Sequence, residues 1–177
     1  SDLRAVLLHL GLHATQQLSG INAGFYYSTT FLDGVIPNPA LGTALVGLVN
    51  VVATMLASSL MDGQRRVTML ALSIGGMLVS AAVLTLALQG LLSNAWALVG
   101  VILYVFFFEL GLGPGCWLIP SEVFYNAIRM RAMTLATFAN RVTTTGVVAS
   151  AISIQDAWSW SGFFAWYGST ALVAAAF

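Results

Sequence analysis

Apolar residues dominate this chain in six long runs that are separated by short polar connections. The runs lie near residues 5–31, 40–61, 67–90, 95–119, 131–152 and 162–177. All but the last, which is shorter, are close to the roughly 20 residues that an α-helix needs to cross the hydrocarbon core of a bilayer. The connections are brief and rich in turn-forming or charged residues, so no soluble domain fits between the runs. The pattern predicts an all-α membrane protein with six transmembrane helices.

The charged residues agree with this prediction and suggest an orientation. Of the 177 residues only 7% are charged, whereas a soluble domain has about 25%. The chain has six arginines, no lysine and six acidic residues, and no basic patch that could hold phosphate, so no nucleic-acid partner is expected. Five arginines precede the first run or lie in alternate connections: Arg4, Arg65, Arg66, Arg129 and Arg131. The other connections carry Asp33 and Asp156. Because arginine is retained on the cytoplasmic side, we expect Ser1 and the arginine-bearing connections to face the cytoplasm.

The first run contains an unusual polar stretch, Gln16-Gln17-Leu18-Ser19-Gly20-Ile21-Asn22. Each unpaired polar group in lipid would cost several kcal/mol, so these side chains need polar partners. An amide both donates and accepts, which suits a neutral polyhydroxylated ligand such as a sugar. On an ideal helix Gln17 points away from Gln16 and Asn22, so either Gly20 and Gly24 loosen the helix or Gln17 bonds a neighbouring helix. The alternative role is that the amides only join adjacent helices.

Two further runs carry polar stripes at helical spacing. The second run has Thr43, Gly47, Asn50, Thr54 and Ser58, and the fifth has Thr134, Thr137, Asn140, Arg141, Thr144 and Thr145. Such faces must point away from lipid, so with the first run they could line one solute pathway. Small polar residues also permit close helix packing, and for the second run contact between helices is an equal alternative.

The fourth run contains glycines at 111, 113 and 115 around Pro114, a pattern that predicts a kink or an unwound segment. Glu109 and Arg141 lie at similar depth, about 15 Å from the inner ends of adjacent runs. Either charge alone near the bilayer centre would be costly, so we predict that the two residues form an ion pair.

Three stretches of the chain resemble the sugar porters of the major facilitator superfamily, the group that contains glucose and xylose transporters. They are residues 16–22 with Tyr26-Tyr27, Glu109 with residues 113–117, and residues 120–124 continuing to 129–132. In that order they resemble the family's seventh helix, its tenth helix and the cytoplasmic loop that follows. The resemblance implies that residues 1–177 are helices seven to twelve of a twelve-helix fold, cut within the last helix, with the N-terminal half lying outside this chain.

The resemblance also implies roles for individual residues. The residues that match sugar-contacting positions are Gln16, Gln17, Asn22, Asn50, Phe108, Glu109, Trp117, Asn140 and Thr144. In this set Trp117 would pack against the sugar ring. The residues that match a cytoplasmic salt-bridge cluster, which steadies the outward-facing state in the family, are Asp62, Arg65, Arg66, Glu122 and Arg129.

The function implied is transport of hexose or pentose across the cell membrane by alternating access. The expected partners are a monosaccharide, the lipid bilayer and the N-terminal half of the same transporter, and proton coupling is left open. The alternatives are a non-transporting sugar sensor and a paralogue that is truncated or serves only as an assembly partner. No phosphate-binding loop or nucleophile elbow indicates an enzyme. His9 and His13 have a spacing that can hold a metal, but a third ligand is missing, so neither a metal nor a cofactor is expected.

Overall fold

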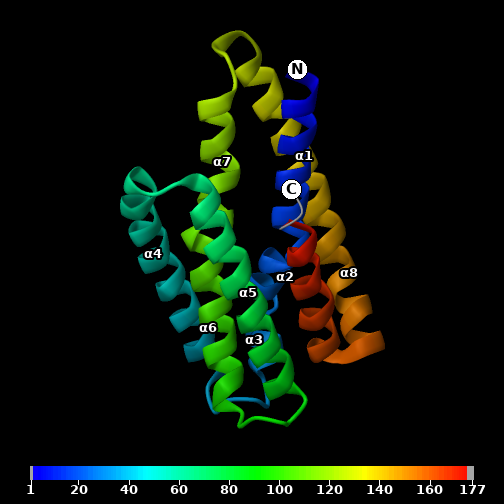
Figure 1. Cartoon of the computed structure of the whole chain (residues 1–177). Helices are drawn as coiled ribbons and strands as arrows, with labels where there is room; N and C mark the ends of the chain where they lie inside the picture. The colour runs from blue at the N-terminus through cyan, green and yellow to red at the C-terminus, as the bar shows by residue number, and fades with distance from the viewer. Residues whose placement is uncertain (1, 175–177) are drawn as a thin grey trace.

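The chain folds into a bundle made entirely of α-helices. The computed structural model describes residues 2–174, with side chains for 4–126 and 128–170. In chain order the helices are α1 (Asp2–Leu18), α2 (Ile21–Tyr26), α3 (Ser28–Leu32), α4 (Pro39–Gly63), α5 (Arg66–Leu88), α6 (Ala95–Leu110), α7 (Leu112–Val123) and α8 (Asn126–Ala174). Figure 1 shows the longer helices side by side along one bundle, with the short α2 and α3 between them. The prediction of an all-α protein is confirmed.

The eight helices of the described part of the chain correspond to the six predicted runs, with two runs divided and two merged. The first run is divided into α1, α2 and α3, and the fourth into α6 and α7. The last two runs form the single element α8, which is interrupted at Ser159 by a backbone with φ 64° and ψ 174°. Residues 175–177 of the sixth run lie outside the described residues. The N-terminus and the α7–α8 connection lie toward one end of the bundle (Figure 1).

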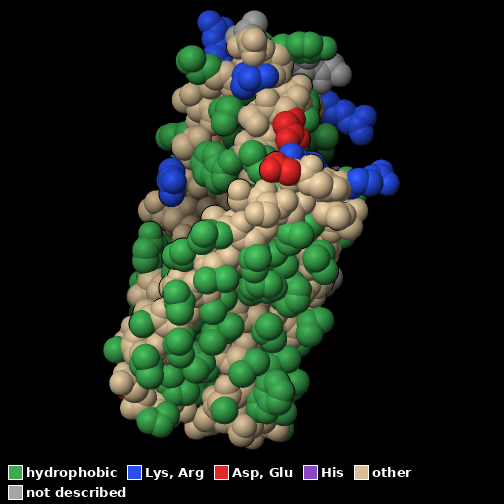
Figure 2. Space-filling view, turned by 90° about the vertical axis from the view of Figure 1, so that its left-hand side faces the viewer, with side chains coloured by type: hydrophobic (Ala, Val, Ile, Leu, Met, Phe, Trp, Pro, Cys, Tyr) green, Lys and Arg blue, Asp and Glu red, His purple; other side chains and the backbone are tan. Residues whose placement is uncertain are grey.

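Three described stretches are long and apolar enough to cross a membrane: Pro39–Gly63, Arg66–Leu88 and Ala95–Val123. The other predicted runs are helical but are not among these stretches; α1, for example, has only 17 residues. Large apolar side chains are exposed along α4 and α5, with Met55 68% and Val79 65% exposed. Figure 2 shows hydrophobic side chains over much of one face and charged side chains gathered at one end. This distribution is the one that a bilayer requires.

Close approach between helices depends on small residues. α1 packs mainly against α8, α4 against α6, and α5 against α6 and α8. A Cβ atom on Gly100 of α6 would lie 2.9 Å from the Cβ atom of Leu84 in α5. Lipid provides no hydrophobic force between helices, so tight packing of this kind holds the bundle together.

The break between α1 and α2 occurs within the polar stretch, at Gly20. Gly20 has φ 76°, a conformation that glycine adopts without steric cost. Backbone carbonyls freed at this depth need partners inside the protein. The Tyr104 hydroxyl donates to the carbonyl of Ser19 over 2.6 Å, and the Thr170 hydroxyl donates to that of Leu18 over 2.6 Å. The break is therefore stabilised by α6 and α8.

The break between α6 and α7 confirms the kink predicted from the glycines and proline. The hinge is Gly111, with φ −145° and ψ −61°. Pro114 lies in the first turn of α7, where its missing N–H removes no helical hydrogen bond. The backbone N–H of Leu112 donates instead to the Ser73 hydroxyl of α5 over 3.1 Å. At both breaks, Gly20 and Gly111, backbone groups at the helix ends thus form hydrogen bonds with side chains of other helices.

Candidate functional site

Four carboxamides from three helices meet in the centre of the bundle. We call Gln16, Gln17, Asn22 and Asn140 the amide cluster. The Gln17 Nε2 atom donates to Asn140 Oδ1 over 3.1 Å and to Gln16 Oε1 over 3.3 Å. The Asn140 Nδ2 atom donates to Gln16 Oε1 over 2.8 Å, and Asn22 donates to Gln17 Oε1. The helix is broken at Gly20, and the side chain of Gln17 also reaches a neighbouring helix. Both explanations considered for Gln17 therefore apply.

The cluster extends through His13 to Trp117. The Asn140 Nδ2 atom lies 3.2 Å from His13 Nδ1 and donates to the His13 carbonyl over 3.4 Å. Because the amide nitrogen donates to Nδ1, this contact places the imidazole proton on Nε2. The rings of His13 and Trp117 meet edge to face, with centroids 4.7 Å apart. His13 was not predicted as a site residue, although its position three residues before Gln16 places it on the same helix face.

A second cluster holds the carboxylate of Glu109. The Asn50 Nδ2 atom donates to Glu109 Oε1 over 2.7 Å, and the Thr54 hydroxyl donates to Oε2 over 3.1 Å. We call Asn50, Thr54 and Glu109 the carboxylate cluster. It joins α4 to α6, and both Asn50 and Glu109 are half-buried. The polar stripe predicted on the second run therefore contributes both to helix contact and to this cluster.

Gly113 lies between the two clusters. Its carbonyl accepts a hydrogen bond from Gln16 Nε2 over 3.0 Å, and the Leu112 carbonyl accepts from the same atom over 3.2 Å. A Cβ atom on Gly113 would lie 3.0 Å from Glu109 Oε2 and 3.1 Å from Cε1 of Phe108. The start of α7 is thus in contact with members of both clusters, and a side chain at Gly113 would crowd the carboxylate.

The predicted ion pair between Glu109 and Arg141 is wrong. Glu109 is bound by Asn50 and Thr54, and Arg141 is exposed on α8. The physical reason is the lateral order of the helices: α6 packs mainly against α4 and α5, whereas α8 packs mainly against α1 and α5. Similar depth in the membrane did not place the two residues side by side.

The predicted sugar contacts differ in how much hydrogen-bonding capacity they retain. Gln16 uses both ends of its amide within the protein, and the Thr144 hydroxyl donates to the carbonyl of Asn140 over 2.8 Å. The half-buried Asn22 and Asn50 have amide oxygens with no hydrogen bond among the described residues. These oxygens and the carboxylate of Glu109 can still accept hydrogen bonds from a ligand.

A separate hollow lies away from both clusters. It has a volume of about 440 Å³ and lies between α1, α5 and α7. Its lining is apolar apart from His9, and it contains none of the predicted sugar contacts. The two polar clusters, rather than this hollow, are the candidate site.

A family model described as "Sugar (and other) transporter" matches residues 1–177. The chain belongs to this family. The resemblance to sugar porters is therefore confirmed, and so is the expectation that this sugar transporter chain is not an enzyme. As a member of the family it is an integral, multi-pass membrane protein.

Individual relatives support the same conclusion. The chain is 38% identical over 142 residues to the chicken "Solute carrier family 2, facilitated glucose transporter member 2", covering 77% of this chain and 27% of that protein. It is 41% identical over 138 residues to the Arabidopsis thaliana "Plastidic glucose transporter 4", covering 75% of this chain and 25% of that protein. The chain thus spans about a quarter of the length of these relatives.

A solved structure shows the fold. The chain resembles the major facilitator superfamily proton:xylose symporter XylE bound to 6-bromo-6-deoxy-D-glucose, with a TM-score of 0.85 and 27% identity. The match covers 97% of this chain and 38% of the symporter chain. The helices described above therefore form part of a major facilitator fold.

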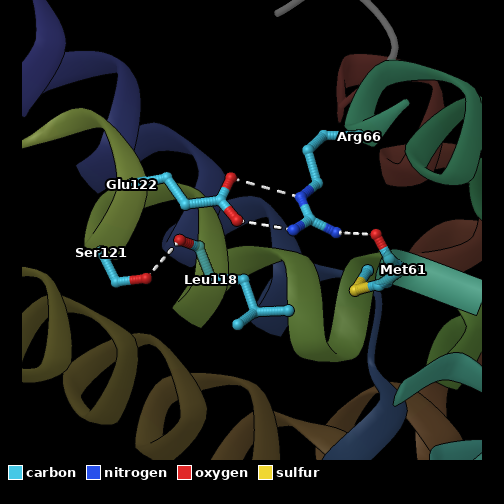
Figure 3. A network of polar contacts seen from close by, with 5 residues as sticks. All are labelled: Met61, Arg66, Leu118, Ser121 and Glu122. Atoms are coloured by element: carbon cyan, nitrogen blue, oxygen red, sulfur yellow. Dashed lines mark hydrogen bonds and ion pairs between the residues drawn. The ribbon is translucent and has the colours of Figure 1, made fainter. Parts of the chain in front are cut away.

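The predicted cytoplasmic salt-bridge cluster is formed in part. The Arg66 guanidinium binds the Glu122 carboxylate through two hydrogen bonds, of 2.5 and 3.2 Å, and donates to the Met61 carbonyl over 2.5 Å (Figure 3). These contacts join the start of α5 to the ends of α7 and α4. The Arg129 Nε atom donates to the carbonyl of Phe124 over 3.0 Å. Asp62 and Arg65 are exposed, and within the described residues neither forms an ion pair.

We predict that the pair formed by Arg66 and Glu122 controls transport more than stability. An exposed pair adds little to stability, but contacts that exist in only one conformation shift the equilibrium between conformations. Arg66→Gln and Glu122→Gln should each change the rate of sugar uptake several-fold, and the double variant should be no more affected than either single variant. Arg65→Gln is the matched control and should leave uptake unchanged. Additive effects of the two substitutions would show that the residues act separately.

Proposed function

We propose that this chain forms the C-terminal, six-helix half of a twelve-helix transporter that carries hexose or pentose across the cell membrane by alternating access. In this proposal the chain supplies most of the residues that bind the sugar. The observation that supports it best is the meeting of the amide and carboxylate clusters at Gly113, beside two broken helices. Discontinuous helices around a central polar site are typical of secondary transporters.

The chemistry of the clusters suits a neutral sugar. Each sugar hydroxyl both donates and accepts, and the accepting groups offered are the oxygens of Asn22, Asn50 and Glu109. The bond from Asn22 to Gln17 can be exchanged for bonds to the ligand, because both side chains carry an amide. The half-buried Trp117, held by His13, offers an aromatic face to the apolar C–H side of a pyranose. The relatives named as glucose and xylose transporters favour this substrate class.

The helix breaks provide a way to couple binding to movement. Rocking of two halves around a central site needs segments that bend, and Gly20 and Gly111 interrupt the two helices that carry Gln17 and Glu109. The contact between Arg66 and Glu122 would form in one conformation and break in the other. Retention of the arginine-bearing connections in the cytoplasm would place this contact on the inner side of the membrane.

The proposal is tested by uptake of labelled D-glucose and D-xylose into vesicles that contain the whole transporter. Gln17→Ala removes the donor to Asn140 and the acceptor for Asn22, and should lower uptake at limiting sugar concentration by about tenfold or more. Gln89→Ala, which changes an exposed glutamine of the α5–α6 connection, is the matched control. Uptake that both variants support equally would contradict the proposal. If the unaltered protein binds sugar but does not take it up, the result would favour a sugar sensor.

A further inference from the structure

Arg141 is a charged side chain deep within α8 for which the described residues provide no ionic partner. It lies ten residues after Arg131, about 15 Å along the helix, and its side chain is exposed. The carboxylate at similar depth, that of Glu109, is bound by Asn50 and Thr54. A guanidinium at this depth is costly in lipid, so it must face water, a ligand or another protein surface.

The face of α8 that carries Arg141 is polar. On an ideal helix Arg141 shares an arc of about 100° with four threonines, whereas Leu135 and Val142 point to the other exposed side. Each of these threonine hydroxyls donates to the carbonyl four residues earlier, over 2.8 to 2.9 Å; they are Thr134, Thr137, Thr144 and Thr145. Their hydroxyl protons are therefore used within the helix. The guanidinium is the strong donor that this face leaves for a ligand.

The position of Arg141 next to Asn140 links this donor to the amide cluster. Asn140 is 1% exposed and holds Gln16, Gln17 and His13 together. Successive residues of a helix differ in direction by about 100°, so α8 directs Asn140 into the cluster, whereas the exposed Arg141 lies on the adjacent face of the same turn. A ligand that reached the amide cluster along this exposed face would meet the guanidinium.

We propose that Arg141 binds the carboxylate of an acidic sugar, so that the site accepts hexuronates as well as neutral hexoses. This inference rests on the proposed function of the amide and carboxylate clusters. The planar guanidinium fork matches the two oxygens of a carboxylate and can bind both at once. A single guanidinium balances a monoanion, whereas it would balance only about half of the nearly two negative charges of a phosphate. Carboxylate is therefore the favoured anion.

The test is competition against labelled D-glucose uptake by the whole transporter in vesicles. D-glucuronate, D-glucose 6-phosphate and unlabelled D-glucose are the competitors. Glucuronate should compete with the unaltered protein, and Arg141→Gln should raise the ratio of half-inhibitory concentrations, glucuronate over glucose, by about tenfold. Arg131→Gln, at the exposed start of the same helix, should leave this ratio unchanged. Arg141→Lys, which keeps the charge but not the fork, should give an intermediate ratio.

Several results would overturn the inference. Glucuronate could fail to compete, the ratio could stay the same in Arg141→Gln, or glucose 6-phosphate could compete better than glucuronate. If Arg141→Gln lowers the thermal unfolding midpoint and Arg141→Lys restores stability without changing the ratio, Arg141 binds another part of the protein instead. If the unaltered protein takes up no glucose, the proposed function fails. In that case direct binding of labelled glucuronate that Arg141→Gln abolishes would still support the inference.

Discussion

Replacement of Asn140 by leucine should lower the free energy of unfolding by about 2 kcal/mol and abolish sugar uptake. Asn140 takes part in four contacts: with Gln16, with Gln17, and with the ring and carbonyl of His13. The amide of Asn140 has two N–H donors, which three acceptors share, and its oxygen accepts one further bond, so about three hydrogen bonds form at a time. At about 0.6 kcal/mol each, the average inside membrane proteins, three bonds sum to about this value. Leucine has a similar size, so the loss reflects unpaired polar groups rather than a cavity. The measurement is the thermal unfolding midpoint of the purified protein in detergent, together with uptake.

Asn94→Leu is the matched control for this prediction. Asn94 is exposed at the start of α6 and its side chain makes no capping hydrogen bond. The substitution should therefore change neither stability nor uptake. If Asn140→Leu unfolds at the same temperature as Asn94→Leu, the amide cluster does not hold the helices together in the way described.

Replacement of Gly111 by alanine should destabilise the protein by about 1–3 kcal/mol and slow transport. A Cβ atom at this position would lie 2.7 Å from the Cβ atom of Ser73, and closer still to the carbonyl oxygen of Met69. A backbone atom cannot rotate away as a side chain can, so α5 and the hinge would have to separate. The hydrogen bond from Leu112 to Ser73 would be lost as a result. Unfolding midpoint and uptake rate are again the measurements.

Gly75→Ala provides the contrast, because no atom lies within 4 Å of a Cβ at that position in α5. Removing a glycine from a helix interior is expected to stabilise the helix by about 0.5–1 kcal/mol. The two glycine variants should therefore change the unfolding midpoint in opposite directions. Equal midpoints would show that the hinge tolerates a side chain and that the close approach of α5 has no importance.

Much of the arrangement of the polar groups could be predicted from the sequence. Amides inside an apolar run need partners within the protein, and a bond from Gln17 to a neighbouring helix was one of the two explanations that this requirement left open. The side chain of Gln17 forms this bond with Asn140. The glycines around Pro114 predicted a break in the fourth run, because they weaken the helix locally. The break is centred on Gly111 rather than on the proline, since the backbone of α5 approaches that residue closely.

Other contacts depend on which helices are neighbours, and the sequence does not contain that order in a simple form. The ion pair between Glu109 and Arg141 was predicted from depth alone, yet α4 supplies the partners of Glu109. The carbonyls of Ser19 and Leu18 are satisfied by Tyr104 and Thr170, which lie far away in the chain. His13 could have been predicted, because its position three residues before Gln16 places these two side chains near the same helix face.

The most direct test of the central claim is a structure of the whole transporter with D-glucose or D-xylose bound. The account predicts sugar hydroxyls within hydrogen-bonding distance of Gln17, Asn22 and at least one member of the carboxylate cluster, with the ring against Trp117. Sugar bound in the apolar hollow between α1, α5 and α7, or bound without any contact to the amide cluster, would contradict it.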